Sequence, residues 1–96
     1  MTKLKSQLSR ASRIENLVKE RFAPLAFKLI DESNRHAGHA GARPGGETHY
    51  RLRLVSAAFT GLNRVARQRL VHEVLREEFN AGLHALSLEL KAPGEL

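Results

Sequence analysis

Cysteine is absent from this chain of 96 residues, which excludes disulfide bonds, a cysteine nucleophile and any thiolate metal site built by the chain alone. Aromatic residues are also scarce, at 5% of the sequence, so few rings are available for stacking against the bases of a single-stranded nucleic acid. The five histidines are therefore the only imidazole or thiolate groups that the chain offers to a metal.

Long apolar segments are missing as well. No apolar run is long enough to cross a bilayer, and none is followed by the small-residue site at which a signal peptide is cleaved. Apolar residues make up 42% of the chain and charged residues 27%, as in an ordinary globular domain with a modest core. We therefore expect one domain without a membrane contact, in the cytoplasm or, as the alternative, in the mitochondrial matrix.

Acidic residues are missing from the start of the chain, although the net charge of the whole chain is +6. Four basic residues precede the first acid, Glu15, and these are Lys3, Lys5, Arg10 and Arg13. We interpret residues 1–12 as a flexible basic arm, because chain termini are often unstructured. A nucleic-acid-binding arm and a short targeting peptide are the alternatives.

The spacing of the apolar residues predicts the order helix, strand, strand, helix, strand. The expected elements are a helix over 13–22, strands over 25–31 and 49–56, a helix over 65–79 with a short turn of helix near Leu62 before it, and a strand over 83–90. Ser12 followed by Glu15 offers a capping box for the first helix, and Pro24 ends it. The domain then covers 13–91, with a flexible tail over 92–96.

The first two strands are joined by a long loop over 32–48 and should pair antiparallel, whereas the third should run parallel to the second after a right-handed crossover. The helices then cover one face of a three-stranded mixed sheet in an α+β fold. This topology brings four histidines to one end of the sheet: His36 and His39 in the loop, and His49 and His84 at the strand starts. His84 has the phase of the leucines that follow it, which predicts a position on the core side.

Four segments, taken in order, resemble the BolA family. They are Asp31-Glu32-Ser33 with His36 and Gly46-Glu47-Thr48-His49-Tyr50, then Val55 to Leu62, then Arg67 to His72, and finally Leu83 to Leu86. The resemblance covers about 14–90 and implies a class II KH-like fold, α-β-β-α-(α)-β, in agreement with the element order. One departure is Gln68, which stands where the family often has a histidine, on a helix away from the histidine end of the sheet.

The resemblance implies a metal site at that end. The family's histidine on the closing strand corresponds to His84, and the loop histidine of the subgroup without a loop cysteine corresponds to His36, with His39 as its competitor. Such proteins pair with monothiol glutaredoxins and share a two-iron two-sulfur cluster, to which the glutaredoxin contributes a cysteine and a bound glutathione. Imidazole can replace thiolate on one iron, as in Rieske centres. On this interpretation the chain alone holds no cofactor.

The implied function is that of an adaptor in iron–sulfur cluster trafficking or in iron- and stress-responsive regulation, and not that of an enzyme. The sequence agrees with the last point, since it has no P-loop and no nucleophile paired with a base. A strand-start histidine bonded to a carbonyl group is the structural alternative for His84, and a solvated loop residue is the alternative for His36. His49 is expected to order the loop and His72 to be structural. Weak homodimerisation stays open.

Binding of double-stranded DNA is the rival function, because the KH-like fold resembles nucleic-acid binders and BolA proteins are described as transcriptional regulators. The basic residues that could meet phosphates are Arg64, Arg67 and Arg69 at the start of the long helix and Arg51 and Arg53 on the second strand. A solvated basic face is the alternative. The string Gly38-His39-Ala40-Gly41 has the letters of the KH loop, but it lies between two strands, so we do not interpret it as a KH site.

Overall fold

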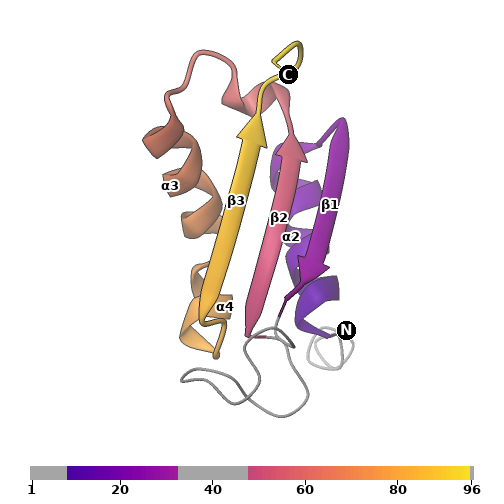
Figure 1. The fold of residues 1–96 in the computed structure, drawn as a ribbon, viewed down its shortest axis with the longest axis vertical. Helices are drawn as coiled ribbons and strands as arrows, with labels where there is room; N and C mark the ends of the chain where they lie inside the picture. Colours follow the sequence, from indigo (N-terminus) through magenta and orange to yellow (C-terminus); the bar gives the residue numbers. More distant parts are fainter. Residues whose placement is uncertain (1–8, 33–47, 96) are drawn as a thin grey trace.

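The computed structural model describes residues 9–32 and 48–95, in which the chain forms a three-stranded sheet and several helices (Figure 1). In chain order the elements are α2 (Arg10–Phe22), β1 (Ala26–Asp31), β2 (His49–Val55), the 3-10 helix η2 (Ala57–Phe59), α3 (Arg64–Val74), α4 (Arg76–Asn80) and β3 (Ala85–Lys91). This order confirms the predicted α+β fold. Two of the candidate ligands, His36 and His39, lie outside the described residues.

The central strand of the sheet is β2, which pairs antiparallel with β1 and parallel with β3, as predicted. The register places Leu52 between Leu29 and Leu88, so apolar residues of all three strands share one face. In Figure 1, α2 passes behind the sheet and α3 lies along its β3 side. Arg51 and Arg53 alternate with the buried residues of β2 and therefore belong to the opposite face.

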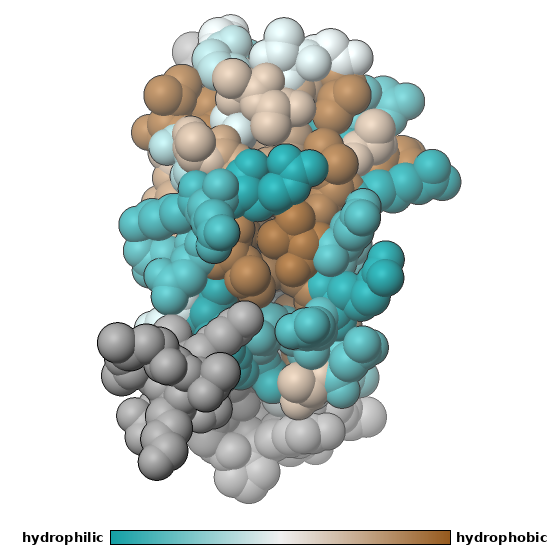
Figure 2. All heavy atoms as spheres, turned by 180° about the vertical axis from the view of Figure 1, so that it is seen from behind, coloured by the Kyte–Doolittle hydropathy of each residue, from teal (hydrophilic) through white to brown (hydrophobic). Residues whose placement is uncertain are grey.

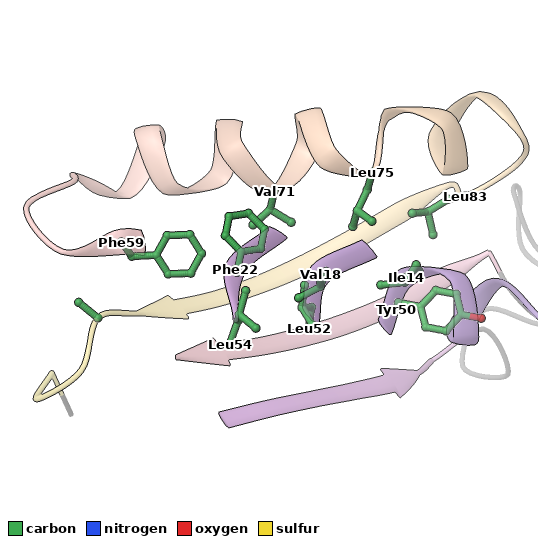
Figure 3. Packing of buried hydrophobic residues seen from close by; sticks show 11 residues of the cluster. Ile14, Val18, Phe22, Tyr50, Leu52, Leu54, Phe59, Val71, Leu75 and Leu83 are labelled. Atoms are coloured by element: carbon green, nitrogen blue, oxygen red, sulfur yellow. The ribbon is translucent and has the colours of Figure 1, made fainter. Parts of the chain in front are cut away.

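The core lies between this sheet and the helices (Figure 3). Leu52 and Leu54 on β2 are at most 1% exposed, and burial of such a side chain contributes roughly 1.5–3 kcal/mol. The buried residues of α2 follow helical spacing and are Ile14, Val18 and Phe22. Phe59 of η2 closes one end, with its ring centroid 5.2 Å from that of Phe22. From the helical side, an apolar strip is visible between hydrophilic side chains (Figure 2).

The first helix begins earlier than predicted, at Arg10, so the last part of the segment interpreted as a flexible arm is helical. Ser9 is the N-cap, because its side-chain oxygen accepts a hydrogen bond from the backbone N–H of Ser12 at 3.1 Å. The prediction that Ser12 caps this helix is therefore wrong. The extension has a physical reason: Arg10 and Arg13 both bond the buried carboxylate of Glu78 on α4.

The long helix predicted over 65–79 is divided into α3 and α4 at Leu75. No glycine or proline marks the break, and Leu75 keeps a backbone bond to the carbonyl oxygen of Val71 at 3.0 Å. The break at Leu75 between α3 and α4 places Glu78 toward α2. The predicted short turn of helix before α3 corresponds to η2, after which Asn63 caps α3 by accepting from the backbone N–H of Ala66 at 2.8 Å.

The segment after β3 packs on the domain, although the sequence predicts a flexible tail over 92–96. Ala92 is 3% exposed, and the Glu95 carboxylate accepts hydrogen bonds from Arg67 and from the backbone N–H of Ala92.

The first strand starts one residue later than predicted. Leu25 lies outside β1 and is 73% exposed, rather than sharing a buried face with Phe27. Within 9–32 and 48–95, no helix is long and apolar enough to span a membrane.

Candidate functional site

The histidine end of the sheet is formed by the end of β1 and the starts of β2 and β3, at the bottom of Figure 1. The backbone N–H groups of His84 and Ala85 both donate to the carbonyl oxygen of Thr48, at 2.8 and 3.0 Å. These bonds join the chain before β3 to the residue before β2. As a result, the rings of His49 and His84 lie 5.2 Å apart between centroids, with an angle of 48° between their planes.

The two histidines at this end differ in exposure. His49 is 7% exposed, and its Nδ1 atom lies 2.9 Å from the hydroxyl oxygen of Thr48. His84 is exposed, which corrects the prediction that it lies on the core side. The correction follows from the strand boundary, because β3 starts only at Ala85 and His84 lies in the irregular stretch after the turn at Ala81 and Gly82, where the φ of Gly82 is +126°. An exposed imidazole is thus backed by a buried one.

This arrangement offers only part of a metal site. Within 9–32 and 48–95, no group of three or more histidine, cysteine, aspartate or glutamate side chains is placed to hold a metal ion. His84 is accessible to an outside group, and its backbone is fixed by the bond to Thr48. Any metal centre at this position would therefore need further ligands from beyond the described residues.

A second candidate site lies at the other end of β3, where a cavity of about 540 Å³ follows the edge of the sheet. It is lined by Arg51, Arg53, Leu62, Arg64, Arg67, Gln68, Ser87, Leu88, Glu89 and Leu90. Four of the five arginines proposed from the sequence to meet phosphates thus line one cavity. Arg69 does not line the cavity. It lies two residues after Arg67 on the same helix, and such a spacing places the two side chains on nearly opposite sides of the helix.

Three of the four arginines of this cavity are already paired with glutamate carboxylates. Arg67 is the most constrained: its Nε donates to the carbonyl oxygen of Leu62 at 2.9 Å and its Nη1 to that of Leu90 at 3.2 Å. Both Nη atoms also donate to the Glu95 carboxylate, at 2.6 and 2.8 Å. The hydrogen bonds from Arg67 and from the Ala92 N–H lower the pKa of Glu95 to about 2, and Glu95 in turn raises the pKa of Arg67.

The two strand arginines form weaker pairs. Nε of Arg53 lies 3.2 Å from Glu89, and both side chains are about half exposed, so this pair contributes little to stability. Nε of Arg51 lies 3.3 Å from Glu32. Arg64, the first residue of α3, is exposed and forms no ion pair with any residue of the described parts of the chain.

Comparison with known proteins identifies the family. The family described as "BolA-like protein" matches residues 18–95, most of the chain. The chain belongs to the BolA-like family. Protein BOLA1, chloroplastic, of Arabidopsis thaliana is 45% identical over 89 residues, which are 91% of this chain and 56% of that protein. BolA-like protein 1 of Homo sapiens is 38% identical over 82 residues, 85% of this chain and 57% of that protein.

Solved structures agree with this assignment. The BolA domain of SufE1 from Arabidopsis thaliana superposes on this BolA-like chain with a TM-score of 0.84 at 42% identity, covering 93% of this chain and 98% of that domain. BolA1 from Arabidopsis thaliana gives a TM-score of 0.83 at 43% identity, covering 93% and 97%. The chain therefore spans about half the length of the two curated relatives above, and nearly all of the two solved Arabidopsis thaliana structures.

The contact of His49 with His84 is the feature of this BolA-like domain that the sequence interpretation missed. Both residues were assigned to one end of the sheet, but His49 was expected only to order the loop. The signal that could have revealed the contact is the pairing of the two strand starts, since His49 faces Ala85 in the parallel register. A residue next to Ala85 in sequence must then lie near His49 in space.

Proposed function

We propose that this BolA-like chain is an adaptor that shares a two-iron two-sulfur cluster with a monothiol glutaredoxin, with His84 as one ligand and His36 as the other. The observation that supports the proposal best is the placement of His84. Its exposed ring lies against the buried ring of His49, and the backbone of both strand starts is fixed by Thr48. His39 remains the competitor of His36.

The donor set of the chain fits a shared cluster better than one of its own. A chain without cysteine can supply imidazole only, so thiolates must come from the glutaredoxin cysteine and its glutathione. Such a cluster would supply electron transfer or be passed on as a unit, and imidazole ligation would raise its reduction potential. For this role His84 must be neutral at the ligating nitrogen, which makes binding weaker at acidic pH.

The described residues that flank 33–47, the segment that contains His36 and His39, lie at the histidine end of the sheet. Asp31, the last residue of β1, faces Tyr50, and the backbone N–H of Glu32 donates to the carbonyl oxygen of His49 at 2.8 Å. The described chain therefore leaves and re-enters the domain at the histidine end of the sheet. This supports a ligand pair made of one loop residue and His84.

The test is to mix the chain with a cluster-loaded monothiol glutaredoxin and to record visible absorption and circular dichroism. We expect a new cluster spectrum that His84→Ala removes or alters, and that either His36→Ala or His39→Ala alters in the same way. His72→Ala is the matched control, because His72 lies on α3 and stacks on Phe79 at 5.0 Å. An unchanged spectrum with folded His84→Ala protein would refute the proposal.

We place the adaptor in iron–sulfur cluster trafficking or iron-responsive regulation, in the cytoplasm or the mitochondrial matrix. Transfer of the shared cluster to an apo-acceptor protein, followed by its absorption, separates trafficking from regulation. A rate of transfer that is no faster than from the glutaredoxin alone would argue against the trafficking role.

Double-stranded DNA binding is the second candidate function, favoured by the four arginines that line one cavity. Because three of them are engaged with glutamates, Arg64 is the arginine most available to a phosphate. Fluorescence anisotropy at low salt should show binding that Arg64→Gln weakens, with a shallower salt dependence. Arg76→Gln on α4 removes the same charge elsewhere and should have less effect. Equal affinities of the two variants would contradict DNA binding through this cavity.

A further inference from the structure

Arg67 holds a carboxylate in the way that arginine holds a phosphate. Its two Nη atoms donate to the two carboxylate oxygens of Glu95, which is the two-pronged geometry common to arginine–carboxylate and arginine–phosphate pairs. The carboxylate comes from the segment after β3, and 46% of the Glu95 side chain is exposed. Glu95 thus occupies an oxyanion position that solvent can reach.

The guanidinium group of Arg67 does not depend on Glu95 for its position. Its Nε and Nη1 atoms are bonded to the carbonyl oxygens of Leu62 and Leu90, and only 12% of its side chain is exposed. These bonds fix the plane of the group, so its outer edge would stay in place if Glu95 moved away. An arginine fixed in this way loses little side-chain entropy when it binds a new anion.

The surroundings of Arg67 favour an anion larger than a carboxylate. Four arginines line the cavity, and its volume of about 540 Å³ is in the range of small-molecule sites. Three of them are paired with Glu32, Glu89 and Glu95, which leaves Arg64 as the cation of this cavity without a carboxylate partner among the described residues. Arg64 lies one turn before Arg67, in the first turn of α3, where the helix dipole also attracts negative charge.

We propose that this cavity is a binding site for a phosphate group, and that Glu95 is its tethered competitor. The phosphate takes the place of the Glu95 carboxylate on Arg67, and Arg64 supplies the second cation. The inference goes beyond cluster sharing and does not depend on it. The chemistry is that of a free phosphate or of a phosphate monoester on a small molecule.

A tethered carboxylate acts as a competitor at a high local concentration, so the unmodified chain should bind phosphate weakly. Exposed arginine–carboxylate pairs are modest in strength. Glu95→Gln removes the negative charge while keeping the size of the side chain. We therefore expect it to tighten phosphate binding about two- to five-fold, the change that corresponds to a pair of this strength.

The experiment is a titration of the full chain with inorganic phosphate and, separately, with adenosine monophosphate, followed by amide shifts in ¹H–¹⁵N NMR spectra. The amides of α3 around Arg64 and Arg67 and that of Ala92 should move, with the tightest binding in Glu95→Gln. Glu20→Gln is the matched control, because it removes one negative charge from an exposed position on α2. Adding Arg64→Gln to Glu95→Gln should reverse the gain.

The two titrations distinguish a free phosphate from a phosphate group on a small molecule. Equal gains for both probes would assign free phosphate, and a larger gain for adenosine monophosphate would assign a phosphorylated small molecule. A Glu95→Gln protein that binds neither probe more tightly than Glu20→Gln would overturn the proposal. So would a gain confined to a short DNA duplex, which would instead support the DNA-binding function.

Discussion

Glu78 is a carboxylate buried between two helices, with 6% of the residue exposed. Arg13 donates to it from Nε at 2.8 Å and from Nη2 at 3.0 Å, and Arg10 donates from Nε at 3.1 Å. The hydrogen bonds from Arg13, followed by that from Arg10, lower the pKa of Glu78 although burial opposes them. The negative charge of Glu78 is therefore paired with the charges of Arg10 and Arg13. Removal of the Glu78 carboxylate would leave these two partly buried arginines without that partner.

We expect Glu78→Gln to lower the free energy of unfolding by about 1–3 kcal/mol, because the negative charge is lost and an amide nitrogen cannot accept the bond that the second carboxylate oxygen takes from Nε of Arg13. Urea unfolding monitored by circular dichroism measures the change. Glu77→Gln is the matched control, since Glu77 precedes Glu78 on α4 but is exposed, and we expect a change within about 0.5 kcal/mol. Equal effects of both substitutions would show that the arginine contacts contribute nothing.

Glu78 also makes the free energy of unfolding depend on pH. Because the pKa of Glu78 in the folded chain lies below its ordinary value of 4.5, the carboxylate stabilises the fold above that value. The contribution is lost as the pH falls through the folded pKa. The difference in unfolding free energy between the unmodified chain and Glu78→Gln should therefore be constant from about pH 8 to about pH 5 and shrink below it. A difference that grows in acid would contradict this assignment.

At the scale of elements, the end of α2 is the most strained point of the described chain. Ala23 is the only non-glycine residue within 9–32 and 48–95 with a positive φ, at 43°, and its N–H donates to the carbonyl oxygen of Lys19 at 3.1 Å. This is the left-handed helix end that glycine usually occupies, since a Cβ atom is unfavourable there. Pro24 follows directly and prevents the helix from continuing.

We expect Ala23→Gly to raise the free energy of unfolding by about 0.5–1 kcal/mol, because the relief of the left-handed strain exceeds the added freedom of the unfolded chain. Ala81→Gly is the control: Ala81 also follows a helix, but its φ is −91°, so the substitution should destabilise by up to about 1 kcal/mol. Thermal and urea unfolding of the two variants measure both changes. A loss of stability in Ala23→Gly would show that the strain is not relieved.

The elements themselves were largely predictable, because strong periodic patterns fix strands and helices. The alternation of Tyr50, Leu52 and Leu54 located β2 to within one residue. The break at Leu75 was not predictable from local signals, since the position carries an ordinary helix-forming residue. After the break, Glu78 contacts Arg10 and Arg13 on α2, a tertiary contact between residues more than 60 positions apart that local patterns do not encode.

At the scale of the whole molecule, topology brought His49 and His84 together at one end of the sheet, as the element order indicated. The core-side position predicted for His84 was wrong because β3 starts at Ala85, two residues later than predicted, so the alternation of the strand does not extend to His84. The engagement of Arg67 by Glu95 also escaped prediction, because apolar spacing carries no information about a segment that follows the last strand. The patterns thus grouped the histidines and four of the five arginines correctly, and only the fold revealed which charges are already paired.

The two sites lie toward opposite ends of β3. His84 precedes the strand, whereas Arg67 bonds the carbonyl oxygen of Leu90 near its end. Six residues of extended chain separate these positions, which is about 20 Å. Each site is also held by different contacts, the first by Thr48 and the second by Leu62 and Leu90.

Because distant sites without shared partners usually respond independently, we expect the two functions to be separable. His84→Ala should leave the phosphate affinity of the Glu95→Gln protein unchanged within about two-fold, and Glu95→Gln should leave the spectrum of the cluster shared with glutaredoxin unchanged. The four combinations of these substitutions, each measured by phosphate titration and by visible circular dichroism, form a complete double-mutant cycle. A larger change in either direction would mean that β3 or the adjoining β2 couples the sites, so that phosphate binding would regulate cluster sharing.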